Sequence, residues 1–363
     1  MSKPKNVLLK EKNYFAWPYE EQTKVKHKVL GAYSKVWIAK LGKFNDTLFF
    51  DCHAGCGAYI DEATNEISYG SSFIVEDVAE KINKVRLHKN FICACEIEKQ
   101  YYENYNEVIA DIGKKTISLK NSDFQDVLEE PRIKRYYSYH PTLFFVDPFG
   151  YTLKMSSIEK MMKNKKNEVF INFMFDYLNR FLSISDEKLI DDFFGTHEWI
   201  DAVNLSGNAR EEFLVGLYKN QVKKVTGAKY VFPYKISYPN RDKTYYYLIH
   251  ATNHIDGITY MKDAFASVNN GKVEYLGKKN DIITFFDLSF FKAEEIYDAI
   301  LCNYKGKAIT FEKLWQEIVE DVAYTAKDLS ESLHELETTG KVRVTRVTSK
   351  RCSYKEKDII TVL

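Results

Sequence analysis

The sequence lacks several features that would place the protein in a class at once. No apolar run approaches the roughly 20 residues of a membrane-spanning helix, and the N-terminus has no apolar stretch long enough for a secretory signal. Neither charge sign dominates, because 52 basic and 51 acidic residues give a net charge of +1. No overall field would therefore draw the chain onto nucleic acid or a membrane. We expect a cytoplasmic protein with local binding sites.

The six cysteines do not form a recognisable metal motif. Cys52 with Cys56, and Cys93 with Cys95, lie in or beside predicted buried strands and lack the paired spacing of a zinc site. Free cysteines commonly behave as small buried hydrophobic residues. We expect that role here, and no metal site.

One stretch, residues 47–57, organises the rest of the chain. It combines a continuous apolar run, which is typical of a strand buried on both faces, with Asp51 and the glycines Gly55 and Gly57. Such a turn lets a ligand approach the main chain, and open α/β sheets bind nucleotides at this place. Ile60 stands where a nicotinamide motif has its third glycine, and no Gly-Lys-Ser/Thr of a P-loop follows the strand.

Acidic residues follow three further predicted strands. Glu96 follows the strand 91–95, at a place where nucleotide folds bind ribose hydroxyls, although strand ends at a surface are often acidic anyway. Asp123 could accept a bond from an adenine amino group while Phe124 lies against the ring, or it could simply cap the helix 126–129. Because Asp51, Glu96 and Asp123 follow successive strands, we expect them to gather at one edge.

A stiff turn follows the fourth strand, 142–146, at the same edge of the sheet. Pro148 fixes its own φ and removes a backbone donor, which holds Asp147 in place. Phe149 and Tyr151 follow. Such a turn suits an acceptor for a substrate amino group beside a ring that stacks on a base.

Strands alternate with helices over the first 290 residues, which we assign to one domain. This pattern predicts an α/β fold, a Rossmann-like doubly wound and mainly parallel sheet ending in an antiparallel hairpin. Helices are expected at 20–41, 72–84, 99–109, 153–162 and 258–268, a fifth strand at 168–175, and the hairpin at 230–238 and 244–252. Gly70 is followed by Ser71 and Ser72, which are candidate caps of the second helix. We expect the helical segment 185–225 to be an insertion over the site.

The remaining residues, 291–363, predict a winged-helix domain. Three amphipathic helices (292–302, 310–320 and 325–339) precede two short strands. The wing region carries seven basic residues, from which we select Arg343, Arg346, Lys350 and Arg351 as candidate nucleic-acid contacts. The third helix would read nucleic acid if the module docks on it, but it is acidic. Protein contacts therefore stay open for this module.

The turn Asp51-x-His53-Ala54-Gly55-x-Gly57 resembles the Asp-x-Phe-Ala-Gly-x-Gly loop of class I S-adenosylmethionine-dependent methyltransferases. The resemblance covers roughly residues 45–290. It implies S-adenosylmethionine as cofactor, with the methionine carboxylate at the helix that begins near Ser71. The cofactor-binding residues that it implies are Asp51, His53, Ala54, Gly55, Gly57, Ser71, Glu96, Asp123 and Phe124.

A narrower set of motifs resembles the three-Cys-motif partner family. Besides the glycine turn, the set comprises Gly70-Ser71, Asp147-Pro148-Phe149-Gly150, Asn172-Phe173 with Asn179-Arg180, Gly257 with Met261, and the winged helix. This resemblance implies a methyltransferase-like protein encoded near a radical-enzyme-like partner with three cysteines, often in phage or mobile contexts.

DNA enzymes that methylate amino groups carry Asp/Asn-Pro-Pro-Tyr/Phe at the fourth strand. Here the acid and the first proline match, the second proline is absent, and the aromatic comes one position early at Phe149 or one late at Tyr151. The resemblance implies that Asp147 and the Pro148 carbonyl accept bonds from the target amino group, while Phe149 or Tyr151 stacks on a flipped base.

Two functions of different kinds follow from these observations. The first is a methyltransferase that acts on an amino group of a nucleic-acid base, with the winged helix binding DNA, RNA or a partner. The second is a noncatalytic nucleotide-binding partner of the three-cysteine protein, in a phage-defence or repair system. Fold alone does not decide between them.

Overall fold

The computed structural model describes residues 4–9, 12–84, 87–114, 116–238, 243–270, 273, 296, 303–347 and 354–363. The chain divides into two compact units, the first comprising Met1–Ala264 and the second beginning at Phe265. The sequence placed this boundary at residue 290. Residues 274–290 lie outside the described part, so that boundary stays a prediction. Within the described ranges, no helix is both long enough and apolar enough to cross a membrane.

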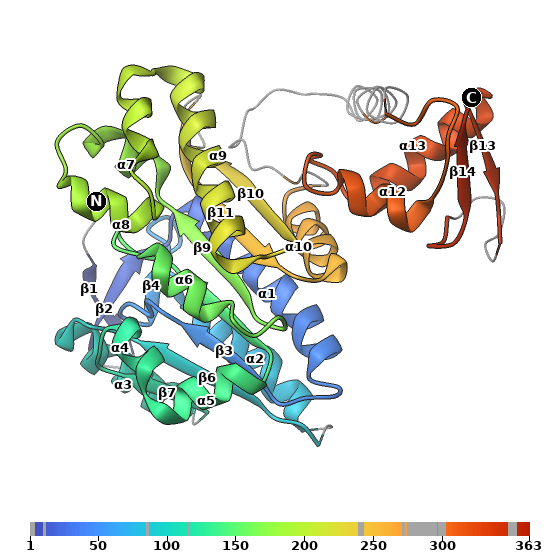
Figure 1. The fold of residues 1–363 in the computed structure, drawn as a ribbon. Coiled ribbons are helices and arrows are strands. Elements are labelled where there is room, and N and C mark those ends of the chain that lie inside the picture. The colour runs from blue at the N-terminus through green and yellow to red at the C-terminus, as the bar shows by residue number, and fades with distance from the viewer. Residues whose placement is uncertain are drawn as a thin grey trace. The chain divides into compact units, whose positions relative to one another are not determined.

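A seven-stranded sheet forms the centre of the first unit (Figure 1). In spatial order its strands are β10 (Tyr230–Ser237), β11 (Thr244–Thr252), β9 (Glu168–Phe173), β8 (Thr142–Val146), β3 (Thr47–Asp51), β6 (Asn90–Cys95) and β7 (Ile117–Lys120). β11 pairs antiparallel with both neighbours, while every other pairing is parallel. Six strands therefore run in one direction and β11 alone runs back. The predicted mainly parallel sheet with its late hairpin is confirmed.

The central strands are apolar because helices cover the sheet. Every residue of β3, β8 and β9 is buried, as expected of strands with two covered faces. The described helices and 3₁₀ turn between residues 21 and 268 are α1 (Glu21–Leu41), α2 (Ser71–Asn83), α3 (Lys99–Ile112), α4 (Phe124–Glu129), α5 (Pro131–Tyr139), α6 (Met155–Met161), α7 (Phe175–Phe181), α8 (Glu187–Phe194), η1 (Glu198–Asn204), α9 (Gly207–Thr226) and α10 (Ile255–Val268), of which the last extends past the boundary at Ala264. α5 and α7 were not predicted.

The helical segment 185–225 has a different place from the one expected. Its longest helix, α9, packs on α6, β10 and β11. Leu214, Tyr218 and Val222 of α9 belong to the same core as Phe173 of β9, and the rings of Tyr218 and Phe173 lie 4.8 Å apart. The apolar face of α9 therefore covers the sheet, and the segment is part of the core rather than an insertion over the site.

An N-terminal hairpin that the sequence did not predict lies beside the glycine turn. β1 (Lys5–Leu9) and β2 (Lys12–Pro18) form a second sheet with β4 (Ala58–Ile60) and β5 (Ile67–Tyr69), in the order β1-β2-β4-β5. Asn104 of α3 fastens this hairpin. Its Oδ1 accepts the Phe15 N–H at 2.7 Å, and its Nδ2 donates to the Cys56 carbonyl at 2.6 Å. These bonds hold β2 against the glycine turn.

The described part of the second unit agrees with the predicted winged helix. It contains β12 (Ala308–Thr310), α12 (Phe311–Ile318), α13 (Ala326–Thr338), β13 (Val342–Thr345) and β14 (Ile359–Val362). The three strands form an antiparallel sheet in the order β12-β14-β13. Thr325 and Asp328 form a reciprocal capping box at the start of α13. The first predicted helix, 292–302, lies outside the described residues except for Ile296.

Candidate cofactor site at the strand ends

The glycine turn lies at the point where the chain order in the sheet reverses. β3 pairs in parallel with β6 on one side and with β8 on the other, so the connections leave in opposite directions. In open α/β sheets the crevice outside such a switch point is where ligands bind, and here that place is the end of β3 beyond Asp51. Gly55 and Gly57 adopt φ values of +66° and +82°, which favour glycine. A Cβ on Gly57 would lie 2.8 Å from the ring of Tyr105. The turn therefore requires glycine at position 57.

Asp51 ties the end of β3 to the start of α2. Its side chain is fully buried and accepts hydrogen bonds from the hydroxyls of Ser71 and Ser72, the latter at 2.7 Å. Burial raises the pKa of Asp51 to about 6, although these hydroxyl bonds act in the opposite direction. The predicted capping role of the serines is wrong, because Gly70 occupies the N-cap and Ser71 is already helical. Asp51 and Ser71 hydrogen-bond to each other and thereby stabilise the turn.

Glu96 follows β6 and is also largely buried. Its carboxylate accepts the Glu98 N–H at 2.7 Å. Burial raises the pKa of Glu96, while backbone bonds from Glu98 and Gly55 partly offset this. The bond from Gly55 places this acid directly beside the glycine turn.

Asp123 caps a helix, which is the local role that the sequence left open. It accepts the Gln125 N–H at 2.7 Å at the start of α4. The adjacent Phe124 is buried, and its ring centroid lies 5.0 Å from that of His53. Burial lowers the pKa of His53 to about 4, which keeps the ring neutral at physiological pH. His53 Nδ1 is buried and has no hydrogen-bond partner within the described ranges.

Asp147 lies in a buried ion pair with Lys26 of α1. Its other carboxylate oxygen accepts a bond from Asn172 Nδ2 at 2.6 Å. Burial raises the pKa of Asp147, but the charge and hydrogen bond of Lys26 and the bond from Asn172 outweigh it, so the net pKa is lowered. Asn172 Oδ1 is buried, and no partner for it occurs among the described residues. The unpaired oxygen of Asn172 therefore lies next to the carboxylate of Asp147, which Lys26 and Asn172 hold in position.

The aromatics after Asp147 have different environments. Phe149 is 61% exposed, and its ring lies 5.1 Å from that of Trp17 in β2. The Trp17 indole in turn lies over the glycine turn, with Nε1 3.5 Å from where a Cβ on Gly55 would be. Tyr151 is buried, and its hydroxyl bonds to Ser185. Of the two aromatics proposed to stack on a base, only Phe149 is accessible, and Pro148 beside it is buried.

The strand-end groups lie at one edge of the sheet, because β8, β3, β6 and β7 are parallel neighbours. The charge of Asp147 contributes to the raised pKa of Asp51, and that of Asp51 to the raised pKa of Glu96. Asp147 and Asp123 both act on His53. The structure thus brings together the acids that the sequence singled out. Lys26 was missed because a lysine on an amphipathic helix usually lies in solvent.

Of the four basic residues chosen in the second unit, the two that the structure describes, Arg343 and Arg346, have different surroundings. Arg346 donates two bonds to the Glu337 carboxylate of α13, one of them at 2.8 Å, and lies over the ring of Tyr354. It therefore fastens the wing to α13. Arg343 is exposed on β13. Lys350 and Arg351 lie outside the described residues.

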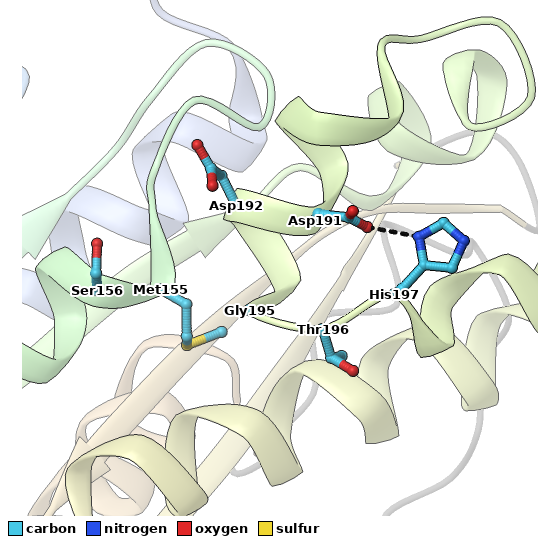
Figure 2. A pocket seen from close by; sticks show the side chains of 7 residues that line it. All are labelled: Met155, Ser156, Asp191, Asp192, Gly195, Thr196 and His197. Atoms are coloured by element: carbon cyan, nitrogen blue, oxygen red, sulfur yellow. Dashed lines mark hydrogen bonds and ion pairs between the residues drawn. The ribbon is translucent and has the colours of Figure 1, made fainter.

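A surface cavity of about 360 Å³ lies apart from these strand ends (Figure 2). Asp191 and Asp192 of α8 line it together with His197. Asp191 Oδ1 accepts bonds from His197 Nδ1 at 2.9 Å and from Trp199 Nε1 at 2.6 Å, so local donors already occupy this oxygen. No group of His, Cys, Asp or Glu with metal-binding geometry occurs in the part of the chain that the structure describes.

The strand order defines the fold class. A mostly parallel sheet with one reversed strand and a glycine turn at its switch point is a Rossmann-like, doubly wound arrangement, here joined to a winged helix. The family model described as the GMT-like wHTH domain matches residues 269–349, which confirms the predicted winged helix. No curated protein matches the sequence.

Several solved structures are similar to part of this chain at low sequence identity. Protein LPL1258 from Legionella pneumophila is 10% identical, over 67% of this chain and 91% of that one, with a TM-score of 0.41. TYW2 of M. jannaschii, in complex with AdoMet, is 10% identical over 69% and 86%, with a TM-score of 0.36. An rRNA methylase from Streptococcus thermophilus is 9% identical over 60% and 93%, with a TM-score of 0.32. The fold class is established by the strand order itself.

Proposed function

We propose that the first unit binds S-adenosylmethionine in the crevice beyond β3 and transfers its methyl group to an amino group of a nucleic-acid base. The observation that carries this proposal is the pairing of a fixed, largely buried carboxylate, Asp147, with an unpaired buried acceptor, Asn172 Oδ1. An amino group has two N–H donors, and these two acceptors match them.

The residues around the crevice fit such a cofactor. Gly55 and Gly57 leave the main chain open to close approach, and Glu96 stands beside them, where a carboxylate can accept bonds from two ribose hydroxyls. His53 Nδ1 is a buried polar atom without a partner in the described ranges, and buried polar groups are normally paired. A bound ligand would supply that partner. Asp51 and Ser71 hydrogen-bond to each other and would hold the turn in shape for the ligand.

The chemistry expected of the chain is orientation rather than proton removal. When bound, S-adenosylmethionine supplies an electrophilic methyl group. Asp147 and Asn172 accept the two N–H bonds of the target and aim its nitrogen at that group. Because the pKa of Asp147 is lowered, this carboxylate is a weak base. The proton that the nitrogen loses as its new C–N bond forms then passes to solvent. Phe149 offers the exposed ring for the target base.

One observation favours the second candidate, a noncatalytic nucleotide-binding partner protein. Lys26 already occupies one carboxylate oxygen of Asp147, which leaves fewer lone pairs for a substrate. The three-cysteine partner and a defence or repair role belong to this candidate. In both candidates the winged helix provides contacts to nucleic acid or to a partner.

Transfer of tritiated methyl groups to DNA, tRNA and rRNA pools separates the two candidates. We expect one pool to be labelled by the wild type, and Asp147→Ala to lose at least about 100-fold of the rate, which is the scale for removing one well-placed polar group. Asp126→Asn, at an exposed acid of α4, is the matched control. Cofactor binding without label in any pool would favour the noncatalytic candidate. Full activity of Asp147→Ala would refute the site.

A further inference from the structure

One face of α5 combines cationic and aromatic side chains and lies largely at the surface. Its members are spaced i, i+3, i+4, i+7 and i+8, which places them on one side of a helix. They are Arg132, Arg135, Tyr136, Tyr139 and His140, which we call the α5 face. The core contacts of α5 are made by Tyr137, Ile133 and Tyr136. Arg132, Arg135 and Tyr139 of the α5 face are exposed, so these three side chains are not needed to hold α5 in place.

The two arginines of the α5 face are free to bind an anion. Arg132 and Arg135 are exposed, and neither has a hydrogen-bond or ion-pair partner among the residues that the structure describes. Lys134 of the same helix, by contrast, pairs with Glu129 at 2.7 Å. Unpaired guanidinium groups one helical turn apart suit the phosphates of a backbone, because arginine binds phosphate through two donors.

Aromatic rings lie beside these arginines. Tyr139 is 73% exposed, and the rings of Tyr136 and His140 stack at 4.4 Å with an interplanar angle of 27°. Phe91, at the start of β6, is 44% exposed and meets Tyr136 edge-on at 5.4 Å. Together with Pro131, the α5 face lines a cavity of about 580 Å³. Aromatic rings and unpaired arginines therefore line the same cavity.

We propose that the α5 face binds single-stranded nucleic acid. Phosphates would bind Arg132 and Arg135, and an unpaired base would stack on Tyr139, the combination by which single strands are bound without sequence preference. A duplex keeps its bases stacked inside and could use only the arginines. An acidic peptide would likewise leave the rings unused. The rings therefore favour a single strand.

This surface is distinct from the strand-end site. α5 leads into the amino end of β8, whereas Asp147 follows its carboxyl end (Figure 1). The five residues of β8 span about 17 Å at 3.3 Å per residue. Binding here would dock a nucleic acid on the first unit without entering the crevice. The proposal can therefore be tested without any methyl transfer.

Fluorescence anisotropy of the full chain with labelled single-stranded RNA, single-stranded DNA of the same sequence and the matching duplex tests this proposal. We expect single strands to bind more tightly than the duplex. Arg132→Ala with Arg135→Ala should reduce the slope of log affinity against log salt by about 1.4, at roughly 0.7 per phosphate contact. Tyr139→Ala should weaken single-strand binding by about 5- to 150-fold, the scale of one stacked base.

Matched variants distinguish the effect of the two positive charges of the α5 face on binding from the effect of the guanidinium shape. Arg132→Lys with Arg135→Lys keeps both charges and should keep the salt slope. Lys35→Ala with Lys188→Ala removes two exposed cations from α1 and α8 and should change little. The three replaced side chains of the α5 face have no partners in the described ranges, so thermal melting should stay at the wild-type value.

Three results would overturn the proposal. The first is wild-type binding by the double alanine variant, and the second is equal binding of duplex and single strand with no effect of Tyr139→Ala. The third is competition by polyglutamate, at equal charge, as strong as that by unlabelled single strand. That last outcome would assign the arginines to an acidic protein partner. Binding of RNA alone, of DNA alone or of both would each support the proposal and would identify the source.

Discussion

Replacing Lys26 by methionine should destabilise the first unit strongly. The side chain of Lys26 is 7% exposed and that of Asp147 is 18% exposed, so Lys26→Met leaves a carboxylate buried without its counter-charge. Breaking a buried pair in this way costs about 3–5 kcal/mol, and at about 2–4 °C per kcal/mol for a unit of this size the melting temperature should fall by about 6–20 °C at pH 7.

The loss should depend on pH in a defined direction. In the wild type the pKa of Asp147 lies below its ordinary 3.8, so the stability it contributes is present at pH 7 and is lost only as pH falls through that lowered value. In Lys26→Met, burial acts without Lys26 to oppose it, and the pKa of Asp147 should rise. The carboxyl group can then be protonated at mildly acidic pH, which removes the cost. Differential scanning calorimetry should show the two proteins converging as pH falls from 7 towards 4.

Two further variants serve as controls for this prediction. Lys26→Met combined with Asp147→Asn buries no charge and should recover most of the lost stability, because replacing both members of a pair is far less costly than removing one. Lys134→Met, at an exposed pair on α5, should melt close to the wild type. A melting temperature for Lys26→Met within about 2 °C of the wild type, the range of an ordinary surface change, would refute the buried pair.

Three other predictions concern the turn and the wing. The pKa of Asp51 is about 6 in the folded protein, against an ordinary value of 3.8, so the free energy of unfolding falls as pH rises between these two values. Asp51→Asn removes this titration. It should stabilise the protein at pH 8 by up to about 3 kcal/mol and give no gain below pH 4. Thermal melts across pH check this. Gly57→Ala should cost at least about 1–3 kcal/mol, because its Cβ would lie 2.8 Å from Tyr105 at a positive φ, and urea unfolding measures it. Arg346→Ala should lower the melting temperature of the winged helix without weakening nucleic-acid binding, because its guanidinium is held by Glu337.

Local patterns allowed much of the fold to be predicted. The apolar runs of β3 and β8 and the turn at Gly55 and Gly57 are short-range signals, as is the capping position of Asp123. Each depends on residues within a few positions of one another. The parallel direction of most strands then follows, because strands alternating with helices fold as parallel crossovers.

What the sequence could not predict depends on distant contacts or weak patterns. Lys26 binds Asp147 across 121 positions, and on a helix rich in lysine nothing distinguishes it from its exposed neighbours. Trp17 reaches the glycine turn through the bonds of Asn104 to β2, which no local pattern indicates. Tyr151 and Phe149 are equally aromatic, and only packing decides that the first is buried and the second exposed.

Calorimetric titration of the full chain with S-adenosylmethionine and S-adenosylhomocysteine tests the cofactor site most directly. We expect both to bind the wild type. Glu96→Ala should weaken binding by about 10- to 150-fold, the scale of hydrogen bonds to a charged group, whereas Glu98→Ala, at the exposed acid two residues on, should bind as the wild type does. Absence of binding heat with either ligand, or unchanged affinity in Glu96→Ala, would contradict the site.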